Sequence, residues 1–293
     1  MQLVLQIVAN GLLIGGLYAL LAVGLTLIFG VLRVVNFAHA EFMMLGMYGA
    51  YWLWSLYGLD PYVSVFLVTP VIFLLGVAVD RLVIQRSIGK PDVTVVFATL
   101  GLSIFLQNAA LTLWTADIRS VSTFATGSVF VVGSVRLSVA MTISFAAAIL
   151  FALGLWFFLT KTMYGKGIQA VAQNRRAAAL MGINVKQAYL ITYSVAVAAA
   201  GAMGVLVAPI FTIFPRVGQT QIVTIFVIVV LGGLGSVPGA VIAALLVGII
   251  RSGAGFMFGT AWGELAYFAV FLLVLIVRPQ GLFGRRGAEV YGG

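Results

Sequence analysis

The sequence of 293 residues is 63% hydrophobic and 8% charged, with a mean hydropathy of +1.19, which excludes an ordinary soluble domain. It contains no cysteine, one histidine and seven acidic residues, so we expect neither catalytic residues nor a metal site. Its net charge of +9 comes from basic residues that lie between apolar segments, which argues against nucleic-acid binding.

Apolar segments that can cross a bilayer follow one another along the whole chain. A hydrocarbon core of about 30 Å needs about 20 apolar residues in a helix. We therefore expect an all-α, polytopic integral membrane protein whose residues 1–293 form a single transmembrane domain. We place about seven full crossings at residues 2–30, 37–57, 62–84, 93–114, 139–159, 188–213 and 262–277.

Polar and ionisable residues lie at the start of the second predicted crossing. Asn36, His39 and Glu41 are found there, and Arg33 comes shortly before them. Ionisable groups at membrane depth are costly and commonly functional, so these residues are candidates for a translocation pathway. The alternative is a capped helix end in which Asn36 is the cap and Glu41 pairs with Arg33. The sequence leaves both possibilities open.

The fourth crossing carries two adjacent amides, Gln107 and Asn108. They are candidates for the same pathway, or they join helices by hydrogen bonds. After this crossing the interval 115–138 is polar, and residues 129–137 have the alternation and the Gly133-Ser134 turn of a small β-hairpin.

The longest polar interval runs over residues 161–187 and contains five basic residues and no acid. Its apolar residues recur at helical spacing, at Ile168, Ala172, Ala179 and Ile183, and polar residues mark another face, at Gln169, Gln173 and Arg176. We predict one or two short amphipathic helices outside the bilayer, because Gly182 and Asn184 form a helix stop. The alternative is a solvated basic loop that only sets the membrane topology.

Residues 221–256 are apolar but are interrupted by the sequence LGGLGSVPG. We expect two short helices that meet at an irregular loop, a feature that needs protein or a water-filled cavity around it. Candidate pathway residues in this loop are Gly232, Gly233, Gly235 and Ser236, although the glycines could equally serve tight helix packing. The loop lacks the Lys-Ser/Thr of a phosphate-binding loop, so it is not a nucleotide site.

The basic residues also predict an orientation. If residues 161–187 are cytoplasmic and 221–256 return to their starting side, twelve of the sixteen Lys and Arg residues lie inside. These twelve include the basic residues of the C-terminal tail, Arg278, Arg285 and Arg286. The same scheme places the N-terminus outside.

Five stretches together resemble a known family. They are NFAHAEFMMLGMYGAY at residues 36–51, the preceding GLYALLAVGLTLIFGVLRVV, the loop GKGIQAVAQNRRAAALMGINV, LGGLGSVPGAVIAALLVGI at residues 231–249, and RPQGLFG near the end. In this order they resemble the permease family of branched-chain amino acid ABC importers, over nearly the whole chain. The resemblance implies a multi-pass protein of the bacterial inner membrane, surrounded by lipid, that works by alternating access.

The resemblance also implies partners. These are a second homologous permease subunit, two cytoplasmic ATPase subunits that bind ATP and Mg, and a periplasmic substrate-binding protein. No cofactor is implied for this chain itself.

Within the polar interval, Arg176-Ala177-Ala178 followed by Gly182 resembles the Glu-Ala-Ala-x-x-x-Gly motif by which ABC permeases contact their ATPases. The sequence differs in having Arg176 where the motif has Glu, and it lacks a later Leu-Pro. The ATPase-coupling residues that we assign on this basis are Gly165, Gln169, Arg175, Arg176, Ala177, Ala178 and Gly182.

Two other transport functions remain as alternatives. A permease for urea or short amides has nearly the same pattern. An ion-coupled secondary transporter would need a coupling acid, for which Glu41, Asp80 and Glu264 are the candidates. Because the candidate pathway residues are nearly uncharged, we expect a neutral or zwitterionic substrate of the Leu, Ile or Val type.

Overall fold

The structure is a computed structural model that describes residues 2–284, and it confirms the all-α, polytopic fold. The α-helices and one π-helix run in the order α1 (Gln2–Leu32), α2 (His39–Tyr57), α3 (Pro61–Val79), the π-helix η1 (Asp80–Ile84), α4 (Gln85–Ser87), α5 (Asp92–Trp114), α6 (Val139–Lys161), α7 (Met163–Gln173), α8 (Arg175–Leu180), α9 (Val185–Val207), α10 (Val217–Gly232), α11 (Val237–Phe258) and α12 (Thr260–Val277). Strands β1 (Val129–Val132) and β2 (Val135–Ser138) pair antiparallel and confirm the predicted hairpin.

Seven helical stretches of the described chain are long and apolar enough to cross a membrane. The number agrees with the prediction, but the set differs in two places. The predicted crossing at 37–57 corresponds to α2, which carries His39 and Glu41 and is not among the seven apolar spans. The seventh span is instead α11, which has 22 residues, whereas we expected a short helix in residues 221–256.

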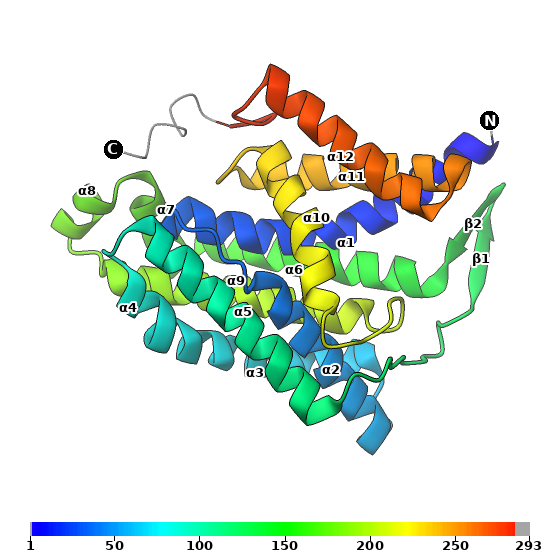
Figure 1. Cartoon of the computed structure of the whole chain (residues 1–293), viewed down its shortest axis with the longest axis horizontal. Coiled ribbons are helices and arrows are strands. Elements are labelled where there is room, and N and C mark those ends of the chain that lie inside the picture. The colour runs from blue at the N-terminus through cyan, green and yellow to red at the C-terminus, as the bar shows by residue number, and fades with distance from the viewer. Residues whose placement is uncertain (1, 285–293) are drawn as a thin grey trace.

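The two ends of the bundle differ in character (Figure 1). The N-terminus lies beside the β-hairpin, where the side chain of Gln6 bonds to the backbone of Arg136. Helices α7 and α8 lie at the opposite end of the long helices, which is also where α12 ends. This arrangement agrees with the predicted orientation, in which the N-terminus and the 161–187 segment are on opposite sides. Arg285 and Arg286 of the predicted inner tail lie outside the described residues.

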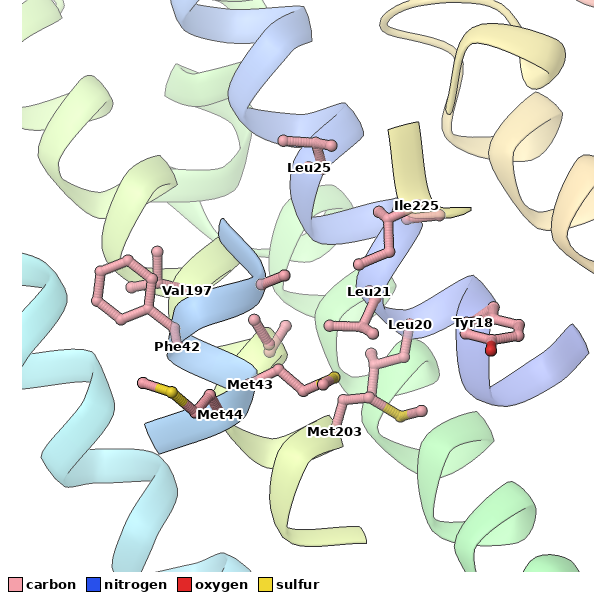
Figure 2. Packing of buried hydrophobic residues seen from close by; sticks show 14 of the residues in the cluster. Tyr18, Leu20, Leu21, Leu25, Phe42, Met43, Met44, Val197, Met203 and Ile225 are labelled. Atoms are coloured by element: carbon pink, nitrogen blue, oxygen red, sulfur yellow. The ribbon is translucent and has the colours of Figure 1, made fainter. Parts of the chain in front are cut away.

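The core forms around α1 and α9, the two spans that are most buried. Figure 2 shows Leu21 of α1, Met43 of α2 and Met203 of α9 pointing toward one another, and all three are at most 2% exposed. Small residues let the backbones approach, as in many membrane bundles. A Cβ added at Gly11 of α1 would lie 2.6 Å from the Cα of Ile249 in α11.

Helix ends follow local sequence signals. Asn184 caps α9, since its side chain accepts a hydrogen bond from the backbone N–H of Gln187 at 3.1 Å. The α9 helix ends at Val207 instead of the predicted 213, because the chain turns at residues 208–210 beside Pro209. The predicted break before α11 is confirmed: Gly233 and Gly235 adopt φ values of 100° and 82°, which favour glycine.

Candidate functional site

The first predicted pathway segment lies deep in the bundle. Residues 33–38 are not helical and connect the end of α1 to the start of α2. His39, the first residue of α2, donates a hydrogen bond from Nε2 to the backbone carbonyl of Leu21 at 3.1 Å. Because Leu21 precedes the end of α1 by eleven residues, α2 begins about 17 Å inside the bundle, measured along α1 from its end.

Asn36 fixes the turn that leads into α2. Its Oδ1 accepts a hydrogen bond from the backbone N–H of Ala38 at 3.1 Å, and its Nδ2 donates to the hydroxyl of Tyr193 in α9 at 3.3 Å. The helix N-cap is Ala38 and not Asn36, so the expected cap was wrong: Asn36 lies two residues before the observed cap and binds its backbone N–H. Asn36, His39 and Tyr193 are all buried, and together they hold the irregular segment against α1 and α9.

Glu41 lies in the first turn of α2 and joins three helices. Its Oε1 accepts hydrogen bonds from Ser103 at 3.0 Å and from Gln107 at 2.7 Å, both on α5. Its Oε2 is buried without a hydrogen-bond partner and faces Gly218 at the start of α10, where an added Cβ would overlap the carboxylate. Oε1 is bound by α5 and Oε2 has no hydrogen-bond partner, which contradicts the alternative in which Glu41 pairs with Arg33.

The two adjacent amides of α5 have different environments. Gln107 is partly buried and binds Glu41, so it does join helices. Asn108 is exposed and donates to the carbonyl of Ile104 in its own helix at 2.7 Å. The structure therefore joins Glu41 to Gln107 of α5, holds Asn36 and His39 against α9 and α1 instead, and leaves Asn108 exposed on α5.

The glycine-rich loop packs at a different place from these side chains. Gly235 packs against Gly30 near the inner end of α1, and the backbone of Gly232 accepts a hydrogen bond from Phe283. The side chain of Ser236 caps α11 by accepting from Gly239 N–H at 3.3 Å. An added Cβ at Gly232 would lie 2.5 Å from Gly239 backbone atoms, so Gly232 serves close helix packing.

The predicted coupling segment forms two helices, α7 and α8, joined at Asn174. Thr162 caps α7 and Asn174 caps α8, each by a side-chain oxygen that accepts a backbone hydrogen bond at 3.0 Å. Their buried apolar side chains, those of Ile168, Val171 and Ala178, form one cluster with Val31 of α1 and Tyr189 of α9. The predicted buried face was wrong at Ala179, which is exposed, because the break at Asn174 shifts the helical register of α8.

Of the seven predicted coupling residues, three maintain the fold and four are exposed. Gly165 contacts the end of α6, where an added Cβ would lie 2.5 Å from the Cα of Leu159. Ala178 is buried, and Gly182 turns the chain with a φ of +81°. Arg175 is exposed but lies over the ring of Tyr189, with 5.5 Å between guanidinium carbon and ring centroid. Gln169, Arg176 and Ala177 are exposed.

Sequence reasoning missed several residues of these sites. Leu180 and Met181, at the end of α8, are 88% and 82% exposed, and two adjacent apolar residues in a polar interval were a visible signal. Ser103, Tyr193 and Gly218 had no such signal, because each becomes important only through a contact with a residue far along the chain.

Two cavities lie in the half of the bundle that contains the N-terminus. The enclosed cavity, between Tyr18, Met43, Met203 and Gln221, has about 10 Å³ of free volume, enough for a single water molecule. An open pocket of about 240 Å³ lies at the outer end, next to Trp54 and Phe211. Within residues 2–284, acidic and histidine side chains form no cluster that could hold a metal ion.

Comparisons with known proteins place this arrangement in a family. The family described as "Branched-chain amino acid transport system / permease component" matches residues 7–277. The chain is 30% identical to the high-affinity branched-chain amino acid transport system permease protein BraD of Pseudomonas aeruginosa, with 97% of both chains covered. It is 29% identical to LivH of Escherichia coli, a permease protein of the same description, again with 97% of both chains covered. No solved structure matches the chain.

Proposed function

The chain belongs to the family of branched-chain amino acid transport permeases, and from this premise we propose that it is the membrane-spanning subunit of an ABC importer for Leu, Ile and Val. It is a multi-pass membrane protein and a transport subunit rather than an enzyme. The chain lacks a phosphate-binding loop, so we assign ATP hydrolysis to other subunits.

The observation that carries this proposal is the attachment of α7 and α8 to the bundle. Their buried residues pack on the inner ends of α1 and α9. Their outer surface presents Arg176 together with the apolar side chains of Leu180 and Met181. A partner that binds this surface and moves can therefore shift α1 and α9, the central helices of the core.

We assign this partner as a pair of cytoplasmic ATPase subunits that bind ATP and Mg. Closure of the ATPase pair on ATP moves α7 and α8 as a rigid unit, and the transporter opens to one side at a time. A second homologous permease completes the membrane part, and a periplasmic binding protein delivers the substrate. The setting is the bacterial inner membrane, where exposed apolar residues such as Phe66, Leu150 and Leu272 contact lipid.

The chemistry of the buried polar side chains around residues 33–41 supports a zwitterionic or neutral substrate. Asn36, His39, Glu41 and Gln107 offer amide, imidazole and carboxylate groups but no pair of fixed charges of one sign. A strongly ionic substrate would lose its hydration without a matching countercharge. Urea or a short amide meets the same condition and is the second candidate.

The test is ATP hydrolysis by the reconstituted complex. We expect no hydrolysis by the isolated chain, and hydrolysis by the full complex that rises when a binding protein loaded with Leu is added. Hydrolysis by the isolated chain, or a complex that transports with an ion gradient alone, would contradict the proposal and favour an ion-coupled transporter.

A further inference from the structure

An ion pair joins the last two apolar spans on the exposed side of the bundle. Arg251 is the one charged residue in the sequence of α11, and Glu264 is the one in α12. Arg251 Nη2 donates a hydrogen bond to Glu264 Oε1 at 3.4 Å, and the two side chains are 26% and 57% exposed. Charged side chains on a span are costly in contact with hydrocarbon. The exposed side of this pair therefore requires a polar neighbour.

The inner side of the pair is fixed by the core. Arg251 Nη1 donates to the hydroxyl of Tyr18 in α1, and its guanidinium carbon lies 5.7 Å from the centroid of the same ring. Gly263 lets α12 approach α11 closely, because a Cβ added there would lie 2.8 Å from the backbone oxygen of Arg251. A guanidinium group carries five N–H donors, so these contacts leave donors for a further acceptor. Within residues 2–284 Glu264 accepts through Oε1, which leaves Oε2 for a donor from outside.

The pair lies close to one membrane surface. Glu264 lies about 6 Å along α12 from its start at Thr260, and Arg251 lies about 10 Å before the end of α11 at Phe258. The exposed rings of Phe258 and Trp262 are 6.3 Å apart at this end of the two helices, and such aromatic residues are typical of the membrane–water interface. Figure 1 shows the start of α12 at the end of the bundle that contains the N-terminus. The ion pair is therefore at the level of the lipid headgroups of one leaflet.

Exposed apolar side chains continue from this level along both helices. Met257 of α11 and Leu265 of α12 are 67% and 58% exposed. They can contact the acyl chains of a lipid whose headgroup lies at the ion pair. The pair itself offers a cationic donor and an anionic acceptor side by side, so it matches a headgroup that carries both an anion and a cation with N–H groups.

The geometry points to a binding site for a phospholipid with an ethanolamine headgroup. The lipid phosphate accepts a hydrogen bond from Arg251, and the primary ammonium donates to Oε2 of Glu264. A choline headgroup has the same phosphate and the same charge, but its trimethylammonium group has no N–H to donate. A glycerol headgroup leaves the carboxylate of Glu264 without a cation. This inference goes beyond the proposed function and depends only on the membrane setting of the chain.

The test compares two lipids that differ in the methylation of the ammonium group. The purified chain in detergent is titrated with phosphatidylethanolamine or with phosphatidylcholine of identical acyl chains, and bound lipid is counted by native mass spectrometry. We expect phosphatidylethanolamine to bind at least about tenfold more tightly, because its ammonium forms a hydrogen bond with a charged acceptor. Equal binding of the two lipids would overturn the site.

The role of Glu264 is tested by Glu264→Gln, which keeps the size of the side chain and removes its charge. We expect this variant to lose the preference for ethanolamine. Asp117→Asn is the matched control and should keep the preference, because Asp117 is exposed in the polar interval after α5, outside the spans. A preference that persists in Glu264→Gln, or that is lost equally in Asp117→Asn, would contradict the assignment.

A second permease subunit is the alternative neighbour of the ion pair. The chain has no cysteine, so Glu264→Cys can carry a single photo-cross-linker in membranes that contain the whole transporter. We expect cross-links to lipid. Cross-links to the second subunit in place of lipid would show that protein covers the pair, and would overturn the lipid site without affecting the proposed function, which uptake measurements test.

Discussion

The exposed apolar pair on α8 provides a quantitative prediction for coupling. Leu180 and Met181 are 88% and 82% exposed, so the folded chain gains almost nothing from burying them. If an ATPase subunit buries Leu180, the contact contributes about 1.5–3 kcal/mol. Leu180→Gln should then weaken ATPase binding about 10- to 150-fold, since each 1.4 kcal/mol is worth about a factor of ten. Met181→Gln should have a similar effect.

The stability of the chain itself should hardly change. Substitutions at exposed positions away from caps and networks alter the free energy of unfolding by about 0.5 kcal/mol or less. The matched control is Ile118→Gln, because Ile118 is 74% exposed and lies in the polar interval at the other end of the bundle.

The assay measures binding of the purified ATPase to each detergent-solubilised variant, together with ATP-driven uptake in proteoliposomes. We expect Leu180→Gln and Met181→Gln to bind weakly and transport slowly, while Ile118→Gln binds the ATPase as the unaltered chain does. Unchanged binding and uptake in both α8 variants would refute the reasoning and show that the basic 161–187 segment only sets the membrane topology.

Further predictions concern the fold and the coupling segment. Gly204→Ala should lower the free energy of unfolding by about 1–3 kcal/mol, because the added Cβ would overlap the backbone of Met43. Gly154→Ala is the control and should leave the stability unchanged, because a Cβ added there meets nothing within 4 Å. Thermal unfolding in detergent measures both. Arg175→Ala should lower stability by about 0.5–1 kcal/mol through loss of its contact with Tyr189, while Arg176→Ala should leave stability unchanged; equal melting temperatures would contradict this. Gly182→Pro should disturb the α8–α9 connection itself, since proline cannot adopt the φ of +81° found there, and unaltered protease resistance of this connection would argue against that.

Much of the fold could be predicted because the signals are local. Long apolar runs marked most crossings, the alternation around Gly133 marked the hairpin, and Gly233 to Ser236 marked the break between α10 and α11. The capped amphipathic helices α7 and α8 were predicted from their polar face. The predicted helix boundaries were less accurate where a single glycine or proline ends a helix. The end of α9, for example, was predicted at 213 but lies at Val207.

The candidate site was predicted only in part. Polar residues in apolar segments identified Asn36, His39, Glu41 and Gln107; the structure joins Glu41 to Gln107 and places Asn36 and His39 against α9 and α1. The sequence could not tell that Gln107 faces Glu41 and that Asn108 faces outward, because this depends on how α5 is rotated against α2. For Gly232 the sequence offered both helix packing and a pathway, and the structure shows close packing against Gly239.

The central claim, import of branched-chain amino acids, is tested most directly by competition for labelled Leu uptake in proteoliposomes that contain the full transporter and ATP. We predict that Ile and Val compete strongly, and that urea, Lys and Glu do not. Uptake of Lys or Glu as fast as Leu would contradict a neutral or zwitterionic substrate, and uptake of urea alone would show that the substrate is an amide and not an amino acid.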